Sequence, residues 1–477
     1  MMNRPNILFA LADDASHFGI YGHEFVNTPH IDWVANHGMR FDNAFTSNPK
    51  CAPSRASILT GRYPWQLEEA CNHYSLFPNK FPLLPDLLEE SGYHIGFTGK
   101  GWAPGDYTYY GLKRNPAGNP YQLKVLKPPE GSQISSCDYA GNFEVFLSER
   151  EQNQPFFFWY GSLEPHRPYS FGEGLRAGKS ISEIQNIPSY WPDESDVKLD
   201  LLDYASEIEW FDLHLGKMLD KLREIGELDN TLIVVTADNG CPFPRVKGQM
   251  YEQDFHLPFV ARLGNRDVSM RCISDIVNFI DIAPTFLEAA GVGPCAEMTG
   301  KSFLELLRGE HPRCARTETY FGREKHDLGR EGDLGYPVRC IRTEEFLYIK
   351  NFAPDRWPAG NPETGYTNCD SSPTKRLILE MKDKGHPIYY NLAFAKRPEK
   401  ELYNIRKDPE CIDNLAGNAE YKRILDELDT KLMNLLKSTN DPRICVDENY
   451  FEKFPYTGDD KHSWKALEEG RWEKQVF

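Results

Sequence analysis

The chain has 477 residues, of which 40% are hydrophobic and 26% are charged, and its formal net charge is −17. This length suits one large enzyme domain with a smaller partner, or two to four average domains. The negative charge argues against binding to a nucleic-acid backbone over a broad surface, because such binding needs a basic footprint. A small anionic substrate stays open wherever basic residues gather locally.

The N-terminal sequence and the cysteines bear on the cellular compartment. "MMNRPNILFALADD" enters a strand-like apolar run at once and shows no signal-peptide pattern. We expect a cytoplasmic protein for the chain as given, or a periplasmic or secreted one if a signal peptide was removed before residue 1. No apolar stretch approaches the ~20 residues that span a bilayer, so we expect no membrane contact. The eleven cysteines are scattered without CxxC pairs, and we expect most of them to be reduced and buried.

In chain order, four short apolar runs that end in polar residues predict buried strands, at residues 6–14, 93–101, 155–166 and 231–240. Helical patterns that close in glycine alternate with them, at residues 28–38, 83–92, 199–226 and 273–291. This alternation is typical of an α/β fold with a mostly parallel sheet. Ligands of such sheets bind beyond the carboxyl ends of the strands, so the polar residues after these runs should converge.

The pattern changes near residue 335. Two strands across a turn, a long loop, a further strand with a turn, and an amphipathic helix are expected in order at residues 336–352, 353–373, 396–409 and 418–438. We therefore expect a large domain at residues 1–335, which carries the site, and a smaller C-terminal α+β domain at residues 336–477.

Two of the predicted strands are followed by residues that could bind a metal. Asp13 and Asp14 follow the first strand, and Asp238 and Asn239 follow a later one. Three carboxylates and an amide would repel one another without a cation among them, and this oxygen-rich set suits Ca²⁺ or Mg²⁺ rather than zinc. Each pair taken alone fits better as turn or helix-cap residues. Their shared position at strand ends favours the metal.

Cys51 lies in the stretch "NPKCAPSRASILTGRYP" at residues 48–64. Arg55 and a helix start with Ser54 as its cap would favour the thiolate form of this cysteine. A lone cysteine near an arginine is more often an inert buried thiol. The residues alone leave four interpretations open: a structural thiol, a metal ligand, a nucleophile, or a precursor that is chemically modified.

The string "CAPSRASILTGR" resembles the signature of the type I, formylglycine-dependent sulfatases of the alkaline phosphatase superfamily, Cys-x-Pro-Ser-Arg followed by Thr-Gly-Arg. Other stretches that resemble this family are "PNILFALADD", "TPHIDWVANHGMRFDNAFTS", "TGK", "PHRPY", "ADNG" and "LYNIRKDPECIDNLAGN". The resemblance implies a large parallel sheet flanked by helices and oxidation of Cys51 to formylglycine (3-oxoalanine) by a maturation enzyme. The hydrated aldehyde would bind calcium, with magnesium as the less favoured ion, and attack sulfur.

The resemblance also implies roles for individual residues. The metal ligands would be Asp13, Asp14, the modified Cys51, Asp238 and Asn239. Arg55 would hold the modified residue, and Lys100 and Lys247 would bind the sulfate group. His166 would contact the sulfate and protonate the leaving atom. Without the family pattern, the lysines fit as solvated surface charges and the histidine as a hydrogen-bonded structural residue.

The sequence departs from the family pattern at two positions. Many sulfatases carry a histidine two residues after the lysine of "GK", where it helps to deprotonate the diol, but this chain has Trp102 there. Trp102 would then form an apolar wall for a sugar ring, or it is a core residue. His256 stands where many relatives carry arginine and is a candidate substrate contact.

The segments "DNGCPFP", "YPVRCIR" and "NDPRICVDE" look most like the heparan N-sulfatase (N-sulfoglucosamine sulfohydrolase) branch of the family. The resemblance implies hydrolysis of a sulfate ester or a sulfamate on a carbohydrate, such as a glycosaminoglycan or another sulfated polysaccharide fragment. Two alternatives stay open. The first is hydrolysis of phosphonate or phosphate esters on the same scaffold. The second is a catalytically silent relative that binds sulfated sugars.

Overall fold

The structure is a computed structural model that describes residues 4–264, 270–310 and 315–474. Its centre is a seven-stranded sheet with the strand order β10-β2-β9-β8-β1-β7-β5. These strands are Arg271–Ile273, Met39–Phe41, Phe259–Leu263, Thr231–Ala237, Asn6–Ala12, Phe156–Gly161 and His94–Gly99. The neighbours β8, β1, β7 and β5 run parallel, whereas β9 runs antiparallel to β8 and to β2.

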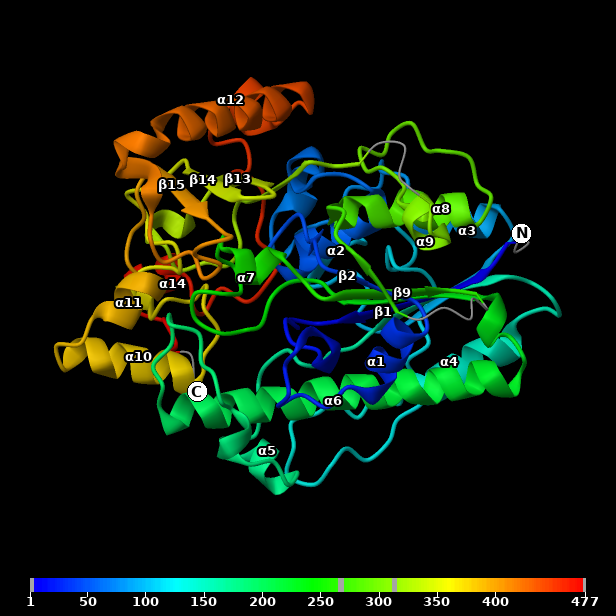
Figure 1. Cartoon of the computed structure of the whole chain (residues 1–477). Coiled ribbons are helices and arrows are strands. Elements are labelled where there is room, and N and C mark those ends of the chain that lie inside the picture. The colour runs from blue at the N-terminus through cyan, green and yellow to red at the C-terminus, as the bar shows by residue number, and fades with distance from the viewer. Residues whose placement is uncertain (1–3, 265–269, 311–314, 475–477) are drawn as a thin grey trace.

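The four parallel neighbours are the four strands that the apolar runs predict. Every residue of β1, β7 and β8 is buried, because helices cover both faces of the sheet. Figure 1 shows α6 (Ser195–Glu224) and α1 (Pro29–Asn36) on one face, and α2 (Cys51–Thr60), α3 (Leu84–Glu90) and α8 (Ile282–Ala289) on the other. The predicted α/β architecture is confirmed.

One helix prediction is wrong in part. The pattern at residues 273–291 predicts a single helix, but α8 begins only at Ile282. Before it, β11 (Val277–Asn278) pairs in parallel with β3 (Ala44–Phe45). The side chain of Asn278 accepts a hydrogen bond from the backbone N–H of Ile280 at 3.1 Å. Asparagine competes with helical backbone bonding in this way and therefore favours a helix start over a helix interior.

The C-terminal part forms a separate four-stranded antiparallel sheet with the order β12-β13-β14-β15. Its strands are Glu318–Arg323, Val338–Thr343, Phe346–Asn351 and Lys400–Asn404. The predicted hairpin, later strand and amphipathic helix are β13, β14, β15 and α12 (Lys422–Ser438). The buried residues of α12 are all leucines at helical spacing, namely Leu425, Leu428, Leu432 and Leu436. Strand β12 belongs to this sheet although it precedes residue 335.

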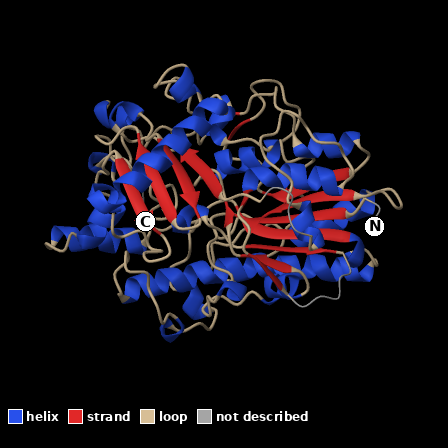
Figure 2. Ribbon diagram, turned by 45° about the horizontal axis from the view of Figure 1, so that its top comes forward, coloured by secondary structure: helices blue, strands red, loops and turns tan. Residues whose placement is uncertain are grey.

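Figure 2 shows the two sheets side by side, with the carboxyl ends of the large sheet's parallel strands turned toward the antiparallel sheet. The remaining elements are short: β4 (Ser75–Leu76), β6 (Gly105–Asp106), α4 (Tyr139–Glu149), α5 (Glu173–Arg176), α7 (Glu252–Phe255), α9 (Leu304–Arg308), α10 (Pro373–Asp383), α11 (Ile388–Ala393), α13 (Pro442–Cys445) and α14 (Trp464–Glu468). The loop expected at residues 353–373 contains one 3-10 turn, Pro362–Thr364.

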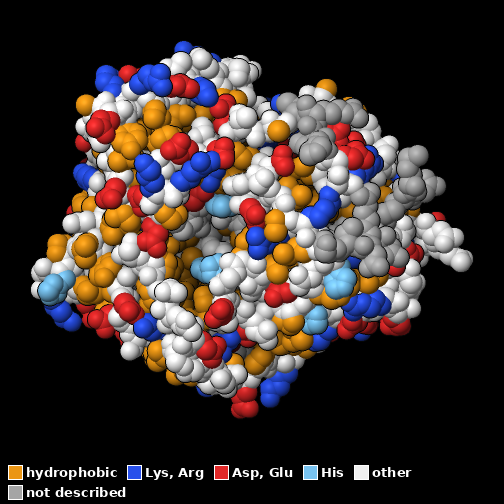
Figure 3. Space-filling model, viewed as in Figure 1, with side chains coloured by type: hydrophobic (Ala, Val, Ile, Leu, Met, Phe, Trp, Pro, Cys, Tyr) orange, Lys and Arg blue, Asp and Glu red, His pale blue; other side chains and the backbone are white. Residues whose placement is uncertain are grey.

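Acidic and basic side chains are interspersed over the face seen in Figure 3, including the surface of α12 at its top. Among the residues that the structure describes, no helix combines the length and the apolar character needed to cross a membrane. The ten described cysteines are all free, and six of them are buried, including Cys51.

Candidate active site

The polar residues after β1 and β8 converge at the edge of the sheet. Asp13, Asp14, Asp238 and Asn239 are each 1% exposed or less. The backbone N–H of Asp14 donates to Asp238 Oδ1 at 3.0 Å, and Asn239 Nδ2 donates to Asp14 Oδ1 at 2.8 Å. Asp14 has a φ of 71°, a left-handed conformation that a non-glycine residue adopts only where its surroundings impose it.

Cys51 joins this group from α2. One ligand atom from each of Asp13, Asp14, Cys51 and Asp238 lies within 4.8 Å of all the others. The helix begins at Cys51 itself, with Lys50 as its N-cap residue, so the expectation that Ser54 caps a later start is wrong. Local sequence favoured serine as a cap, but the Ser54 hydroxyl is used in tertiary contacts instead. It donates to the carbonyl oxygen of Asp238 at 2.6 Å.

The expectation of a stabilised thiolate at Cys51 is also wrong for this arrangement. Burial, followed by the negative charge of Asp13, raises the pKa of Cys51 well above its ordinary value. Arg55 does not offset this effect, because its charge is directed at the carboxylates. Its Nε donates to Asp238 Oδ2 at 2.7 Å, and one Nη donates to the carbonyl oxygens of Lys100 and Gly101 at 2.7 and 3.0 Å.

Two lysines and a histidine surround the carboxylates. Lys100 Nζ lies 2.6 Å from Asp13 Oδ2, and Lys247 Nζ lies 2.5 Å from Asp14 Oδ2. Burial lowers the pKa of Lys100, but the negative groups around it, Asp13 foremost, together outweigh burial and hold that pKa above its ordinary value. His166 Nε2 is 3.9 Å from Asp14 Oδ2, while its Nδ1 donates to the Arg167 carbonyl oxygen at 2.6 Å. Burial lowers the pKa of His166.

The donor set fits a hard divalent cation. Asn239 Oδ1 is buried and has no hydrogen-bond partner among the residues that the structure describes. An unsatisfied amide oxygen in the protein interior is costly, and here it lies beside carboxylates that repel one another. A cation that takes oxygen ligands, as Ca²⁺ and Mg²⁺ do, would satisfy the amide and relieve the repulsion. The residues that would hold it are Asp13, Asp14, Asp238 and Asn239.

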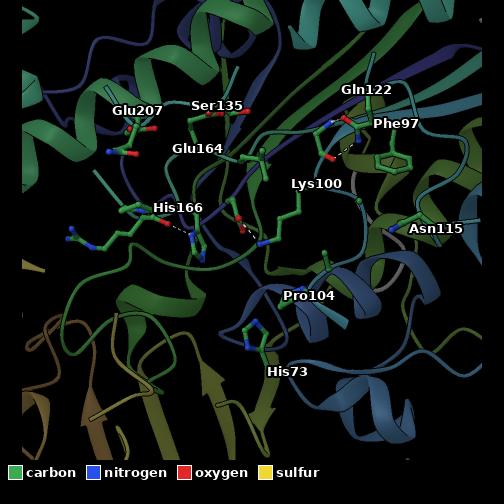
Figure 4. Close-up of a pocket in the computed structure, with 18 of the residues that line it drawn as sticks. His73, Phe97, Lys100, Pro104, Asn115, Gln122, Ser135, Glu164, His166 and Glu207 are labelled. Atoms are coloured by element: carbon green, nitrogen blue, oxygen red, sulfur yellow. Dashed lines mark hydrogen bonds and ion pairs between the residues drawn. The ribbon is translucent and has the colours of Figure 1, made fainter. Parts of the chain in front are cut away.

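A pocket of about 570 Å³ opens over this group, a size within the range of small-molecule sites. Asp13, Lys100 and His166 line it. Figure 4 shows Lys100 and His166 in its centre, with Glu164 and Glu207 on one side and His73 on the other. No motif marks His73 or Glu207, whose neighbourhood comes from distant segments. Glu164 directly precedes the "PHRPY" stretch, but nothing in that stretch assigns it a role.

Trp102 and His256 do not line this pocket in the described part of the chain. Trp102 is 1% exposed and packs edge-on against Phe77, with ring centroids 5.0 Å apart, which favours the core interpretation over the sugar wall. The expectation that His256 contacts substrate is not met either. Its Nε2 lies 2.8 Å from the Asp42 carbonyl oxygen, and its ring stacks on Phe45.

Comparisons with known proteins agree with this geometry. The family model described as sulfatase matches residues 5–292, and the model described as N-sulphoglucosamine sulphohydrolase, C-terminal, matches residues 246–358. The chain is 27% identical to the N-sulphoglucosamine sulphohydrolase of Homo sapiens over 94% of this chain and 93% of that one. It is 26% identical to an ulvan-active sulfatase of Formosa agariphila, over 96% and 80% of the two chains.

A solved structure, described as a complex with its substrate D-glucosamine-2-N,6-O-disulfate, matches with a TM-score of 0.67 at 22% identity, over 93% of this chain and 99% of that one. At this identity the match shows the shared fold. The family model covers more than half of the sequence. It spans the strands that Asp13 and Asp238 follow and the helix that begins at Cys51. The chain belongs to the sulfatase family and is a sulfuric ester hydrolase.

Proposed function

We propose that this chain hydrolyses a sulfate ester or a sulfamate on a carbohydrate, using formylglycine made from Cys51 and a bound calcium ion. The observation that carries the proposal is the buried group of three carboxylates and an unsatisfied amide oxygen around Cys51. Asp13 of this group and Lys100 line the pocket, and Lys247 contacts Asp14. The sulfated-carbohydrate substrates that appear in the names of the relatives support the substrate class.

The residues of the chain have distinct tasks in this proposal. Lys100 and Lys247 present ammonium groups to the non-bridging oxygens of the sulfate, where negative charge accumulates during transfer. Arg55 fixes Asp238 and the 100–101 backbone, so the ligands are preorganised. The hydrate of formylglycine would supply the nucleophilic hydroxyl, and calcium would supply positive charge next to the anionic oxygens.

His166 is placed to act on the leaving group. Its Nδ1–H is held by a backbone carbonyl, so Nε2 is the free nitrogen on the pocket side. A bound sulfate is a negative charge, which favours the protonated ring. The protonated Nε2 can then donate its proton to the leaving oxygen or nitrogen.

Burial constrains how Cys51 is modified. All ten residues of α2, from Cys51 to Thr60, are buried. A maturation enzyme therefore cannot reach the Cys-Ala-Pro-Ser-Arg string in the folded chain and must act on it before folding is complete. The partners in this proposal are the maturation enzyme and a sulfated sugar.

Two measurements test the proposed function. Peptide mass spectrometry of residues 48–62, after co-expression with a maturation enzyme, should show conversion of Cys51 to formylglycine, with Cys51→Ala as the inactive control. Sulfate release should then be measured on N-sulfated glucosamine, on 2-O- and 6-O-sulfated sugars, and on a phosphonate ester. Full activity with an unmodified thiol rejects the mechanism. Preference for the phosphonate ester supports the phosphonate hydrolase alternative, and tight sugar binding without turnover supports the silent relative.

A further inference from the structure

His73 occupies the part of the pocket next to the position where Trp102 replaces the histidine of the family pattern. Strand β4 follows His73 and pairs in parallel with β6, with Ser75 opposite Gly105. This pairing brings the loop that carries His73 beside the loop that carries Trp102 and Pro104. His73 and Pro104 both line the pocket, and Figure 4 shows them on the same side of it, facing Lys100.

The ring of His73 is held at one nitrogen and unpartnered at the other. The residue is 7% exposed, and its Nδ1 lies 2.7 Å from Asp327 Oδ1. Its Nε2 is buried and has no hydrogen-bond partner within the described ranges. The loop itself is fixed, because the His73 backbone N–H donates to the Lys325 carbonyl oxygen at 3.0 Å. Asp327 thus holds the imidazole of a residue that lines the pocket, and the other ring nitrogen is left without a partner.

Asp327 determines which nitrogen of His73 carries the proton. Lys50 Nζ lies 2.9 Å from Asp327 Oδ2. Burial raises the pKa of Asp327, but the charge of Lys50 and the hydrogen bonds from His73 and Lys50 together outweigh burial and hold that pKa well below its ordinary value. An ionised carboxylate only accepts hydrogen bonds, so Nδ1 of His73 is the protonated nitrogen and Nε2 carries the lone pair. Burial lowers the pKa of His73 to about 4, which keeps this lone pair free.

The contacts of His73 with Asp327 and of Asp327 with Lys50 connect this ring to the residue next to Cys51. Lys50 is the N-cap residue of α2 and directly precedes Cys51. Besides Tyr74, whose ring contacts His73, the charged and titratable groups around His73 in the described part of the chain are Asp327, Lys50, Lys247 and His326. Asp327 is the only carboxylate among these four, and it lies on the side of the ring away from the free nitrogen. A proton taken up at Nε2 would therefore be stabilised through Nδ1 by Asp327.

We propose that His73 is the proton acceptor of this pocket, with Asp327 and Lys50 as its positioning residues. The inference rests on the proposed function, because the proton comes from a hydroxyl group at residue 51. In the step, the O–H bond breaks, its electron pair stays on oxygen, and an N–H bond forms at His73 Nε2. The proton later passes to water. No oxidant or further reactant is needed.

The test compares His73→Gln with His256→Gln, a control at a histidine outside the pocket. In the matured chain, we expect His73→Gln to lower kcat by about 10²–10⁴-fold, the range of a lost general base, with KM within about threefold. Added imidazole should restore part of the rate to His73→Ala. His256→Gln should keep kcat within about threefold of the wild type. Thermal unfolding midpoints will show that each variant is folded.

A second measurement does not depend on activity. Nitrogen NMR of the unmodified Cys51 chain should show His73 protonated at Nδ1 and unprotonated at Nε2, and Asp327→Asn should disturb this state. In the double variant His73→Gln, Asp327→Asn, kcat should be little lower than in His73→Gln alone, because both residues act through the same imidazole ring.

The outcomes separate the two proposals. An Nε2-protonated ring overturns the role of His73 whatever the activity. If the wild type and the His73→Gln variant are equally active, the role of His73 is overturned and the proposed function stands. A matured wild type that releases no sulfate overturns the proposed function and the His73 step together.

Discussion

The molecule contains two dense groups of buried charges that differ in how completely they are satisfied. The pocket cluster consists of Asp13, Asp14, Arg55, Lys100, Asp238, Asn239 and Lys247. The core cluster consists of Glu324, Arg339, Asp441 and Arg443, in the C-terminal part of the chain. Both groups are almost inaccessible to solvent, so burial alone does not separate a site from a scaffold.

The core cluster is complete in itself. Arg339 Nε donates to Asp441 Oδ2, and one of its Nη atoms donates to Glu324 Oε1, both at 2.7 Å. Arg443 donates to Glu324 Oε1 at 2.9 Å and to Glu324 Oε2 at 2.5 Å. None of these four described side chains has a buried polar atom without a hydrogen-bond partner. Two positive and two negative groups with satisfied hydrogen bonds form a structural unit.

The pocket cluster is incomplete. The unsatisfied oxygen of Asn239 lies among its carboxylates, and the cavity opens over Asp13 and Lys100. Stability alone would select against such an arrangement, because an unpaired buried polar atom costs about 1–3 kcal/mol. A buried polar atom without a hydrogen-bond partner next to a cavity therefore indicates a ligand site, whereas buried charge by itself does not.

The largest expected effect comes from breaking the pocket cluster. Asp238→Ala should lower kcat/KM for sulfate release by about 10³-fold or more, because it removes preorganised charge from the reacting centre. Calcium should raise the thermal unfolding midpoint of the wild type, and the same variant should lose this increase. Asp441→Ala, in the core cluster, is the control and should keep the calcium response. Retained turnover in Asp238→Ala would reject the metal assignment.

The second effect comes from breaking the core cluster. Arg339→Met should lower the free energy of unfolding by about 3–5 kcal/mol, because it leaves Asp441 and Glu324 with too little positive charge. Urea unfolding measures this loss, and kcat should change little at temperatures where the variant is folded.

The double variant Arg339→Met, Asp441→Leu is the matched control for Arg339→Met. It should recover part of the stability, because it removes both partners of one pair and leaves the Glu324–Arg443 pair. A double variant that is less stable than Arg339→Met would contradict the view of the core cluster as paired charges.

A third prediction concerns Glu252, whose carboxylate links α7 to Arg342 of the antiparallel sheet at 2.8 Å. Burial raises its pKa, but the hydrogen bond with His256 and the charge of Arg342 outweigh burial and lower the pKa to about 2. A carboxyl group with a lowered folded-state pKa stabilises the fold above its unfolded pKa. That contribution, about 3 kcal/mol, is lost as the pH falls from about 4.5 to about 2.

The comparison of wild type with Glu252→Gln checks this window. The difference in free energy of unfolding between the two proteins should be largest above pH ~5 and should shrink below pH ~4. Denaturant unfolding over a pH series measures it. A difference that is constant with pH would show that the charge of Glu252 does not stabilise the contact between α7 and the antiparallel sheet.

The smallest expected effect is at Trp102, which borders the pocket cluster without belonging to it. Trp102→Phe should cost about 1–2 kcal/mol of stability, less than a full truncation of a buried aromatic ring. KM for the sulfated sugar should stay within about twofold, because the ring packs on Phe77 and not on the pocket. An increase in KM of tenfold without loss of stability would instead indicate contact with the sugar.

Four of the seven strands of the central sheet, and the convergence of their polar ends, follow from the sequence alone. Continuous apolar runs can form only buried strands or helix cores, and their short length selects strands, so β1 and β8 were predictable. Since parallel strands end at one edge, Asp13 and Asp238 were expected to meet there, and they do. The motif around Cys51 was equally local, because it is one continuous string of residues.

The surroundings of the site residues depend on the tertiary structure. Nothing local tells that Trp102 is buried or that His256 is held by Asp42. The His73–Asp327 contact joins residues 254 positions apart, so no periodicity could reveal it. Local patterns report which side chains avoid water, whereas the walls of a pocket depend on which distant segments pack together, and that is settled by the whole fold.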